Sequence, residues 1–275
     1  MSIVNSNVRA LTAQQALVVN QRSLSSAMAE LSTGKRINVA ADDAAGSAIH
    51  SKLTTQAISL NMAVRNTNDG ISMMQTADGA AGGIQEMLYR MKELAVQSAN
   101  DTNNFLERTA LNNEFQALET QIRDTVANTT WNGMNLLDGT VGNAGSVGYQ
   151  VGSMANDRVS VVYADFDLAA QPLTTVRAIN NHTNASSALT SIDGAIDQIS
   201  NARATWGAAM NRLVHAGDNA SNVSMNLTES SSRIMDTDYA QATAEFARSL
   251  IMNEAGSAML SQANQQPHYV LALLR

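Results

Sequence analysis

Several residue types are scarce in this chain of 275 residues, and each scarcity excludes a class of protein. The chain has no cysteine, which excludes a disulfide framework, thiol catalysis and cysteine-ligated metal centres. Its two prolines leave almost the whole chain free to form helices. Only 15% of the residues are charged and the net charge is −7, so the basic surface of a nucleic-acid-binding protein is not expected. No apolar run approaches the roughly 18 residues of a membrane span.

The N-terminal part of the chain has an apolar period of seven. This period over residues 3–33 predicts a helix that packs on another helix through a narrow stripe, formed by Ile3, Ala10, Leu17, Leu24 and Leu31. Gly34 is expected to end this helix, and Asp42 and Asp43 are expected to cap the next one. The next pattern covers about residues 44–99 and is interrupted by Gly70, Gly79, Gly82 and Gly83. Because glycine disfavours helix, only packing against neighbours could hold such a helix.

The middle of the chain changes from helical to turn-rich. A shorter helix is expected after Asn104, which has the spacing of a capping box with Glu107. Residues 129–180 then contain the turn dipeptides Asn132-Gly133 and Asp138-Gly139. Alternating apolar residues predict half-buried strands around Tyr149, Val151, Val159, Val161 and Tyr163. We therefore expect one or two small hairpins and no large sheet.

The C-terminal part returns to heptad spacing. Residues 189–234 keep an alternating three–four apolar spacing, which is typical of coiled coils. A last helix is expected from about Thr237 to Gln265, where Pro267 should break it. Its apolar residues are Phe246, Leu250, Ile251, Ala255, Ala258 and Met259.

The two ends of the chain have opposite charge. Residues 1–36 carry four basic side chains and one acid, whereas residues 236–275 carry four acids and two basic side chains. Opposite charge and narrow apolar stripes predict that the ends pair, in parallel or antiparallel order. Neither stripe is wide enough to stabilise a helix alone. Two interpretations stay open: an ordinary intramolecular bundle, or ends that become ordered only when many copies assemble.

No catalytic, cofactor-binding or metal-binding residues are predicted, and an enzyme is not expected. The four histidines are scattered and none has a metal-ligand spacing. Capping and a solvated hairpin account for the carboxylate pairs Asp42-Asp43 and Asp165/Asp167. Phosphate-binding loops and nucleophile elbows are not found.

Several motifs, in order along the chain, resemble the signature sequences of bacterial flagellins. They are LSTGKRIN at 31–38, AADDAAG at 40–46, KELAVQ at 92–97, WNGMNLLDG at 131–139 and QANQQP at 262–267. The resemblance fails only in the middle of the chain, where residues 140–180 leave room for hairpins but not for large outer domains. It therefore points to a short flagellin.

The resemblance implies a mainly α fold in which long coiled-coil-like helices from both chain ends form a rod, with a small β-hairpin region in the middle. Residues 1–40 and 236–275 would form a terminal helical pair in the filament core. Residues 41–130 and 181–235 would form a helical rod domain, and residues 131–180 a variable hairpin region.

The implied function is that of a structural subunit that self-assembles into the flagellar filament for motility. Type III export would explain why the first residues lack the basic and apolar regions of a secretory signal peptide. The expected partners are further copies of the chain, an export chaperone, the filament cap and hook-associated proteins, with no nucleic acid and no membrane. The expected self-assembly residues are Ile3, Ala10, Leu17, Leu24, Leu31, Phe246, Leu250, Ile251, Met259, Leu271 and Leu274.

The resemblance also implies recognition by the host. In flagellins that activate Toll-like receptor 5, the receptor grips an arginine, a leucine and a glutamate, which correspond to Arg90, Leu94 and Glu114. Arg90 and Leu94 are four residues apart and so share one helical face. The helical phase predicts that Leu88 and Met91 face inward and that Arg90 and part of Leu94 face outward.

Two alternatives remain at this stage. A hook–filament junction protein would share the terminal architecture, although such a close match to a filament-type C-terminus is not expected of it. A surface adhesin or glycan-binding homologue would need clustered exposed aromatic residues, and the middle of the chain offers only Tyr149, Tyr163 and Phe166.

Overall fold

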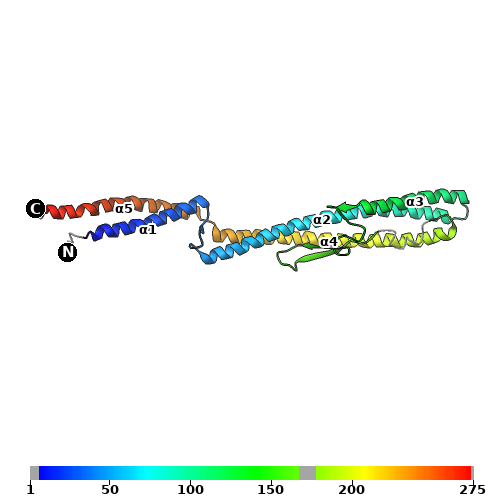
Figure 1. The fold of residues 1–275 in the computed structure, drawn as a ribbon, viewed down its shortest axis with the longest axis horizontal. Coiled ribbons are helices and arrows are strands. Elements are labelled where there is room, and N and C mark those ends of the chain that lie inside the picture. The colour runs from blue at the N-terminus through cyan, green and yellow to red at the C-terminus, as the bar shows by residue number, and fades with distance from the viewer. Residues whose placement is uncertain (1–5, 167–177, 274–275) are drawn as a thin grey trace. The chain divides into compact units, whose positions relative to one another are not determined.

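The computed structural model describes residues 6–166 and 178–273 (Figure 1). It divides into two compact units. One contains Gln56–Met225, and the other contains the described residues on either side of it. The mainly α fold with a small β region is confirmed. The elements are α1 (Val8–Thr33), α2 (Ala44–Ala99), α3 (Phe105–Asn128), β1 (Thr130–Trp131), β2 (Met134–Asn135), β3 (Ser146–Gln150), β4 (Arg158–Val162), α4 (His182–Met235) and α5 (Tyr239–Leu273).

Both ends of α1 are capped. Asn7 precedes the helix, and its side-chain oxygen accepts a hydrogen bond from the backbone N–H of Ala10 at 3.1 Å. Gly34 ends the helix with a φ of +70°, a left-handed conformation that glycine adopts without strain. Its N–H donates to the carbonyl of Glu30 at 2.9 Å. The predicted C-terminal stop at Gly34 is confirmed.

The two aspartates before α2 have different roles. Asp43 caps the helix, because its Oδ1 accepts from the N–H of Gly46 at 2.8 Å. Asp42 holds the preceding loop instead, because its Oδ2 accepts from the N–H groups of Val39 and Asn38. These two hydrogen bonds favour the carboxylate and hold the pKa of Asp42 below its usual value. The predicted capping role is therefore confirmed for Asp43 only.

The predicted long helix is continuous over all 56 residues of α2, despite its glycines. Gly70 is required by packing, since a Cβ at this position would lie 2.8 Å from the ring of Tyr149. At Gly79, Gly82 and Gly83 a Cβ would meet no atom of the described chain within 4 Å. Packing therefore explains Gly70 but not Gly79, Gly82 or Gly83.

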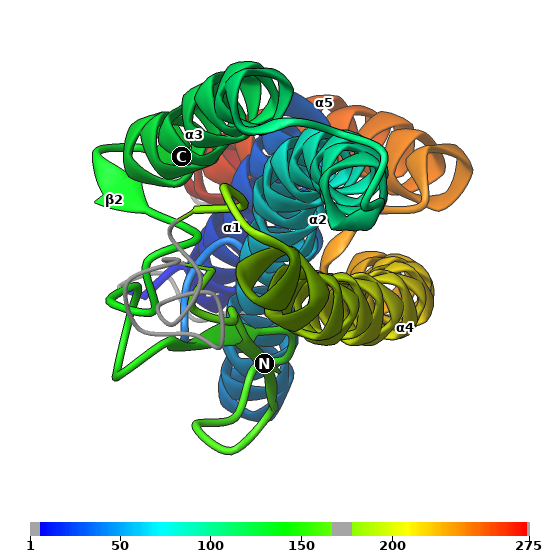
Figure 2. The ribbon, with the colours of Figure 1, turned by 90° about the vertical axis from the view of Figure 1, so that its right-hand side faces the viewer.

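The core of the unit Gln56–Met225 lies among α2, α3, α4 and the hairpins. Figure 2 looks along the helices and shows α2, α3 and α4 as adjacent coils. Trp206 of α4 is fully buried, and its indole N–H donates to the carbonyl of Val162 at 3.0 Å. The rings of Tyr163 and Phe166 lie 5.7 and 5.9 Å from the ring of Trp206. Further fully buried side chains are Phe115, Met74, Ile84, Leu88, Met91, Leu94 and Ile122.

The capping box and the two hairpins occur as predicted. Asn104 and Glu107 each accept from the other's backbone N–H at the start of α3. β1 pairs with β2 around Asn132-Gly133, and β3 pairs with β4 in antiparallel register. The hydroxyls of Tyr149 and Tyr163 lie 2.7 Å apart in the core. Burial raises the pKa of both phenols, so both stay protonated.

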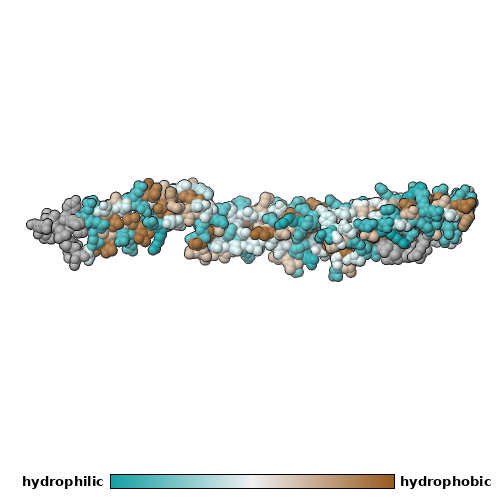
Figure 3. All heavy atoms as spheres, turned by 45° about the horizontal axis from the view of Figure 1, so that its top comes forward, coloured by the Kyte–Doolittle hydropathy of each residue, from teal (hydrophilic) through white to brown (hydrophobic). Residues whose placement is uncertain are grey.

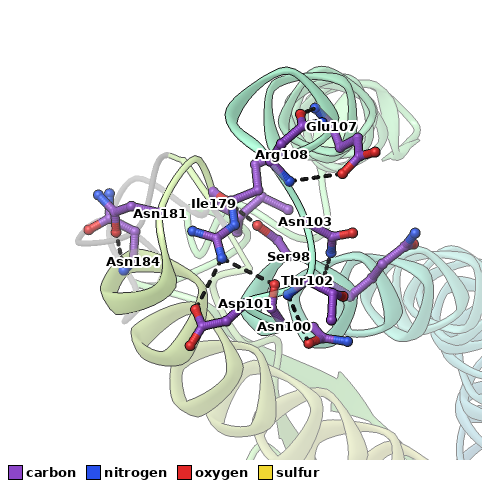
Figure 4. A network of polar contacts seen from close by, with 12 residues as sticks. Ser98, Asn100, Asp101, Thr102, Asn103, Glu107, Arg108, Ile179, Asn181 and Asn184 are labelled. Atoms are coloured by element: carbon purple, nitrogen blue, oxygen red, sulfur yellow. Dashed lines mark hydrogen bonds and ion pairs between the residues drawn. The ribbon is translucent and has the colours of Figure 1, made fainter.

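A polar network closes the end of this unit, where the loop after α2 meets the start of α4 (Figure 4). The guanidinium of Arg108 donates to the carbonyl of Asn100 at 3.1 Å and pairs with Asp101 at 3.3 Å. The hydroxyl of Ser98 donates to the carbonyl of Ile179, whose own N–H donates to Asn112 at 2.8 Å. These bonds satisfy backbone groups of the loops that follow α2 and precede α4.

The last helix differs from the sequence prediction. α5 does not end at Gln265 but continues through Pro267 to Leu273. A proline inside a helix removes one N–H donor and leaves one carbonyl of the preceding turn without its partner. That carbonyl belongs to Ala263, and it accepts a hydrogen bond from the side chain of Asn7 at 2.7 Å. The expected break is therefore wrong, because a residue from the other end of the chain satisfies the group that the proline leaves free.

Candidate functional site

The first and last helices, α1 and α5, lie side by side and form what we call the terminal pair (Figure 1). Three contacts show that they are antiparallel. The side-chain amide of Asn7 donates to the carbonyl of Ala263, and that of Asn20 donates to the carbonyl of Ser249 at 2.8 Å. At the other end of the pair, the hydroxyl of Tyr239 reaches the carbonyl of Leu31 at 3.5 Å. The predicted pairing of the chain ends is confirmed, and its direction is antiparallel.

The residues where the two helices meet, which we call the pair interface, follow a strict heptad spacing on each helix. They are the buried and half-buried residues Ala10, Ala13, Leu17, Asn20, Leu24, Ala27 and Leu31 of α1, and Ala242, Phe246, Ser249, Asn253, Gly256, Leu260 and Ala263 of α5. Four predicted assembly residues of α1 and Phe246 of α5 thus lie in the interface. Most of the other positions carry small or polar side chains, which let the backbones approach closely. The side chain of Leu17, for example, packs 3.2 Å from the Cβ position of Gly256.

The remaining predicted assembly residues of α5 point away from α1. Leu250 is 44% exposed, and Ile251 and Met259 are both 66% exposed. The sequence argument selected the most apolar residues, whereas the heptad phase places Ser249, Asn253 and Gly256 against α1. None of the three therefore packs against α1 within one chain, and their part in self-assembly stays a prediction. Leu271 lies in α5, and Ile3 and Leu274 lie outside the described residues.

The outer faces of the terminal pair are apolar and grooved. On α1, Leu11, Val18 and Val19 are between 48% and 62% exposed. A groove of about 610 Å³ runs between the helices and is lined by residues that include Ala16, Leu17, Asn20, Met252 and Gly256. A second groove of about 580 Å³ continues toward Met259 and Ala263. Figure 3 shows the corresponding brown patches over α1 and α5, at the left of the view.

The pair interface also contains polar atoms without a partner. Asn20 is 9% exposed and Ser249 is fully buried, yet Asn20 Oδ1 and Ser249 Oγ have no hydrogen-bond partner among the described residues. Each unsatisfied buried group costs about 1–3 kcal/mol. The helices of the terminal pair are thus held by a shallow interface that includes unsatisfied groups.

The predicted receptor-binding residues lie together in the other unit. Arg90 Nε donates to Glu114 Oε1 at 2.8 Å, and its Nη1 donates to Glu93 at 2.9 Å. The Arg90 and Glu114 side chains are 50% and 46% exposed. The hydrogen bonds to Glu114 and Glu93 raise the pKa of Arg90, which keeps the guanidinium charged. α2 and α3 thus present an exposed ion pair.

Leu94 does not share this exposure. It is 1% exposed and belongs to the same core as Leu88 and Met91. The inward positions of Leu88 and Met91 are confirmed, but the expectation that part of Leu94 faces outward is wrong. α2 packs against both α3 and α4 at this level, as its ion pairs with Glu114 and Asp193 show, so its buried face is wider than a two-helix stripe.

Sequence reasoning missed the polar members of the terminal pair, Asn7, Asn20, Ser249 and Asn253. Their heptad phase was visible, since Asn20 stands three residues after Leu17 and four before Leu24. In the described part of the chain, histidines and carboxylates nowhere gather in groups of three that could hold a metal ion. No helix of that part is long and apolar enough to span a membrane.

Chain ends that pair largely through small residues and leave apolar side chains exposed are typical of a helical protein that packs against other chains. Sequence comparison gives the family. The bacterial flagellin N-terminal helical region matches residues 4–142, and the bacterial flagellin C-terminal helical region matches residues 189–274. The chain belongs to the bacterial flagellin family, whose members are structural subunits of the extracellular flagellar filament.

The relatives match over their full length. A flagellin of Halalkalibacterium halodurans is 43% identical over 274 residues, which cover 99% of this chain and 100% of the relative. A flagellin of Bacillus subtilis is 36% identical, with 99% of each chain covered. The crystal structure of Bacillus cereus flagellin is 32% identical and has a TM-score of 0.52, covering 57% of this chain and 88% of that one. The chain is therefore a filament subunit of the short form that the sequence indicated.

Proposed function

We propose that the terminal pair is the assembly surface of this filament subunit. The observation that carries the proposal is the distribution of apolar residues: the four residues that the pair buries most fully, Asn20, Ala27, Ala242 and Ser249, are small or polar, whereas apolar side chains such as Leu11, Val18, Ile251 and Met259 are exposed. Burying such a side chain stabilises an interface by roughly 1.5–3 kcal/mol. Other copies of the chain would cover these faces in the filament. In the resulting division, residues 1–40 and 236–275 form the core, 41–130 and 181–235 surround it, and 131–180 form the outer hairpins.

Deletion tests this proposal directly. Removal of residues 1–36 or 236–275 should abolish filaments in negative-stain microscopy while leaving a soluble helical fragment. Deletion of the exposed hairpin turn at residues 153–156 serves as the control and should leave polymerisation intact. Filaments of normal length from either terminal deletion would contradict the proposal.

We further propose that the terminal helices are not stably ordered in the free subunit. The pair interface is shallow and lacks partners for two buried polar atoms, so it recovers little of the entropy that ordering costs. Trypsin should then trim dilute monomer to a core of roughly residues 40–235. Protection of Arg9, Arg22 and Arg248 in that monomer would show that the pair is stable by itself.

A second proposed role is recognition by Toll-like receptor 5. The exposed Arg90–Glu114 pair supports it, because arginine is common among residues that dominate binding energy. Arg90→Ala should lower receptor activation in a reporter-cell assay at unchanged circular dichroism. Arg123→Ala is the matched control, since Arg123 has a similar exposure to Arg90 and pairs with Glu119 on α3. Equal potency of the wild type and the Arg90 variant would remove Arg90 from the site.

The buried position of Leu94 changes how that site must be tested. A Leu94→Ala substitution would open a cavity in the core, so its loss of activity would report folding rather than contact.

The route of secretion is also a proposal: type III export with an export chaperone, followed by assembly under a filament cap on hook-associated proteins. It is supported only by membership of the family.

A further inference from the structure

One carbonyl of α5 lacks its usual hydrogen-bond donor. In an α-helix the carbonyl of residue 263 accepts from the N–H of residue 267. Residue 267 is a proline and has no N–H, yet the helix continues to Leu273. The missing donor is replaced from the other end of the chain, because Asn7 Nδ2 lies 2.7 Å from the carbonyl oxygen of Ala263.

The side-chain oxygen of Asn7 also has a hydrogen-bond partner. Asn7 Oδ1 accepts from the N–H of Ala10 and so caps α1. The Asn7 side-chain amide therefore bonds to both helices of the terminal pair: its NH2 group donates to α5, and its oxygen accepts from α1. This fixes the start of α1 opposite a single turn of α5.

Apolar packing in the pair interface defines the register only weakly. On α1 leucine recurs at positions 17, 24 and 31, and α5 has a small residue at 242, 249, 256 and 263, so sliding α1 by one heptad brings mostly the same kinds of residue together. The Asn20 amide also finds only a backbone carbonyl, that of Ser249, and every helical turn offers carbonyls. In contrast, Ala263 is the one carbonyl of α5 whose donor is removed by a proline, since the other proline of the chain is Pro172.

We propose that Asn7 and Pro267 form a register lock that selects one alignment of the two chain ends in the assembled subunit. The proline creates a free carbonyl at one point of α5, and the asparagine at the start of α1 is the positioning residue that satisfies it. Any slipped alignment leaves that carbonyl without a donor. This inference rests on the proposed role of the terminal pair in assembly.

A double-mutant cycle tests the lock. Asn7→Ser keeps a capping oxygen but is too short to bridge to Ala263, and Pro267→Ala restores the N–H that the carbonyl lacks. The measurement is the concentration of full-length monomer in equilibrium with filaments. Asn7→Ser should raise this concentration three- to tenfold in the wild-type background and less than twofold in the Pro267→Ala background.

Asn20→Ala is the matched control, because its amide bonds to α5 at a turn without a proline. It should raise the monomer concentration by the same factor in both backgrounds. Equal effects of Asn7→Ser in the two backgrounds, or an effect below twofold in the wild-type background, would overturn the lock.

Disulfide mapping reads the register itself, and the chain contains no native cysteine to interfere. Leu17→Cys with Gly256→Cys reports the described alignment, and Leu17→Cys with Ser249→Cys reports a slip of one heptad. Asn7→Ser should raise the displaced cross-link in filaments at least threefold, and Pro267→Ala should raise it as well, because either change removes the difference between the two alignments; the two changes together should raise it no further. An unchanged displaced cross-link would overturn the lock.

The failure of the lock can be told apart from the failure of the proposed assembly surface. If the lock alone fails, wild-type filaments still show the Leu17–Gly256 cross-link and terminal deletions still abolish polymerisation. If the terminal pair is not the assembly surface, filaments form from the deleted chains. A variant that is not incorporated even at one part in ten of wild-type subunits also counts against the lock, since Asn7 would then be needed for pairing rather than for register.

Discussion

The terminal pair and the core around Trp206 are both built from long helices with heptad spacing, but they use their apolar residues in opposite ways. In the core, the largest apolar side chains are enclosed, and the indole N–H has a partner. In the terminal pair, the interface is small and partly polar, while Ile251 and Met259 are mostly exposed. The core is therefore complete within one chain. The terminal pair leaves several large apolar side chains exposed within one chain.

The largest effect is expected from a substitution in the core around Trp206. Trp206→Ala should lower the free energy of unfolding of the monomer by about 3–5 kcal/mol, because it removes a fully buried ring and its hydrogen bond. Urea denaturation followed by circular dichroism measures this. The other tryptophan, Trp131, is half-buried, and Trp131→Ala should cost clearly less. Equal losses for the two variants would contradict the contrast.

The next largest effect is expected from substitutions in the terminal pair. Ile251→Ala and Met259→Ala should each change the stability of the monomer by less than about 0.5 kcal/mol, because both side chains are exposed there. In the filament each should raise the equilibrium monomer concentration by roughly 10- to 150-fold, as expected when burial contributes about 1.5–3 kcal/mol. Met154→Ala, at an equally exposed methionine in the β3–β4 turn, is the control. A larger effect on the monomer than on the filament would contradict the proposal.

A smaller effect is expected from pH, through the contribution of Asp138 to the stability of the fold. Burial opposes ionisation of Asp138, but hydrogen bonds from Thr140 and Asn135 outweigh it and hold its pKa below the usual value. A lowered folded-state pKa stabilises the fold above the unfolded pKa, and this stabilisation is lost as the pH falls through the folded value.

Asp138→Asn should therefore cost about 1 kcal/mol at neutral pH. The difference from wild type should shrink below a pH of about 4. Asp218→Asn, at an exposed carboxylate of α4, is the control and should cost clearly less at neutral pH. A constant difference between Asp138→Asn and wild type from neutral to acid pH would contradict this assignment.

The smallest effect is that of salt. Ion pairs on the surface, such as Arg248–Glu245 on α5, contribute about 0–1 kcal/mol each. Raising the ionic strength from about 0.1 to about 1 M shortens the screening length from about 10 to about 3 Å. The monomer concentration in equilibrium with filaments should change by less than about threefold. Filaments that dissolve in high salt with intact helices would show that charge, not apolar burial, holds the terminal pair in the polymer.

The sequence predicted the helices and hairpins well because their signals are local. Heptad spacing, the Asn104 capping box, Gly34 and the Asn132-Gly133 turn each act within a few residues. It did not predict which face of α5 meets α1, because Ile251 and Met259 are apolar in any context and only the partner helix decides which face is covered. The continuation of α5 past Pro267 depends on Asn7, 260 residues away in the chain, and Leu94 is buried because α3 and α4 both reach α2. No local pattern carries such information.

The glycines of α2 that the core does not explain have a mechanical consequence. Gly79, Gly82 and Gly83 lie within five residues, and their missing side chains restrain the backbone least. The buried side of the same stretch holds Ala77 and Ala81, with Ile84 as its one larger side chain. We therefore expect bending of this 56-residue helix to be easiest at this stretch, which would act as a hinge. A curved polymer could take up its strain at this hinge in each subunit, without repacking the aromatic cluster around Trp206.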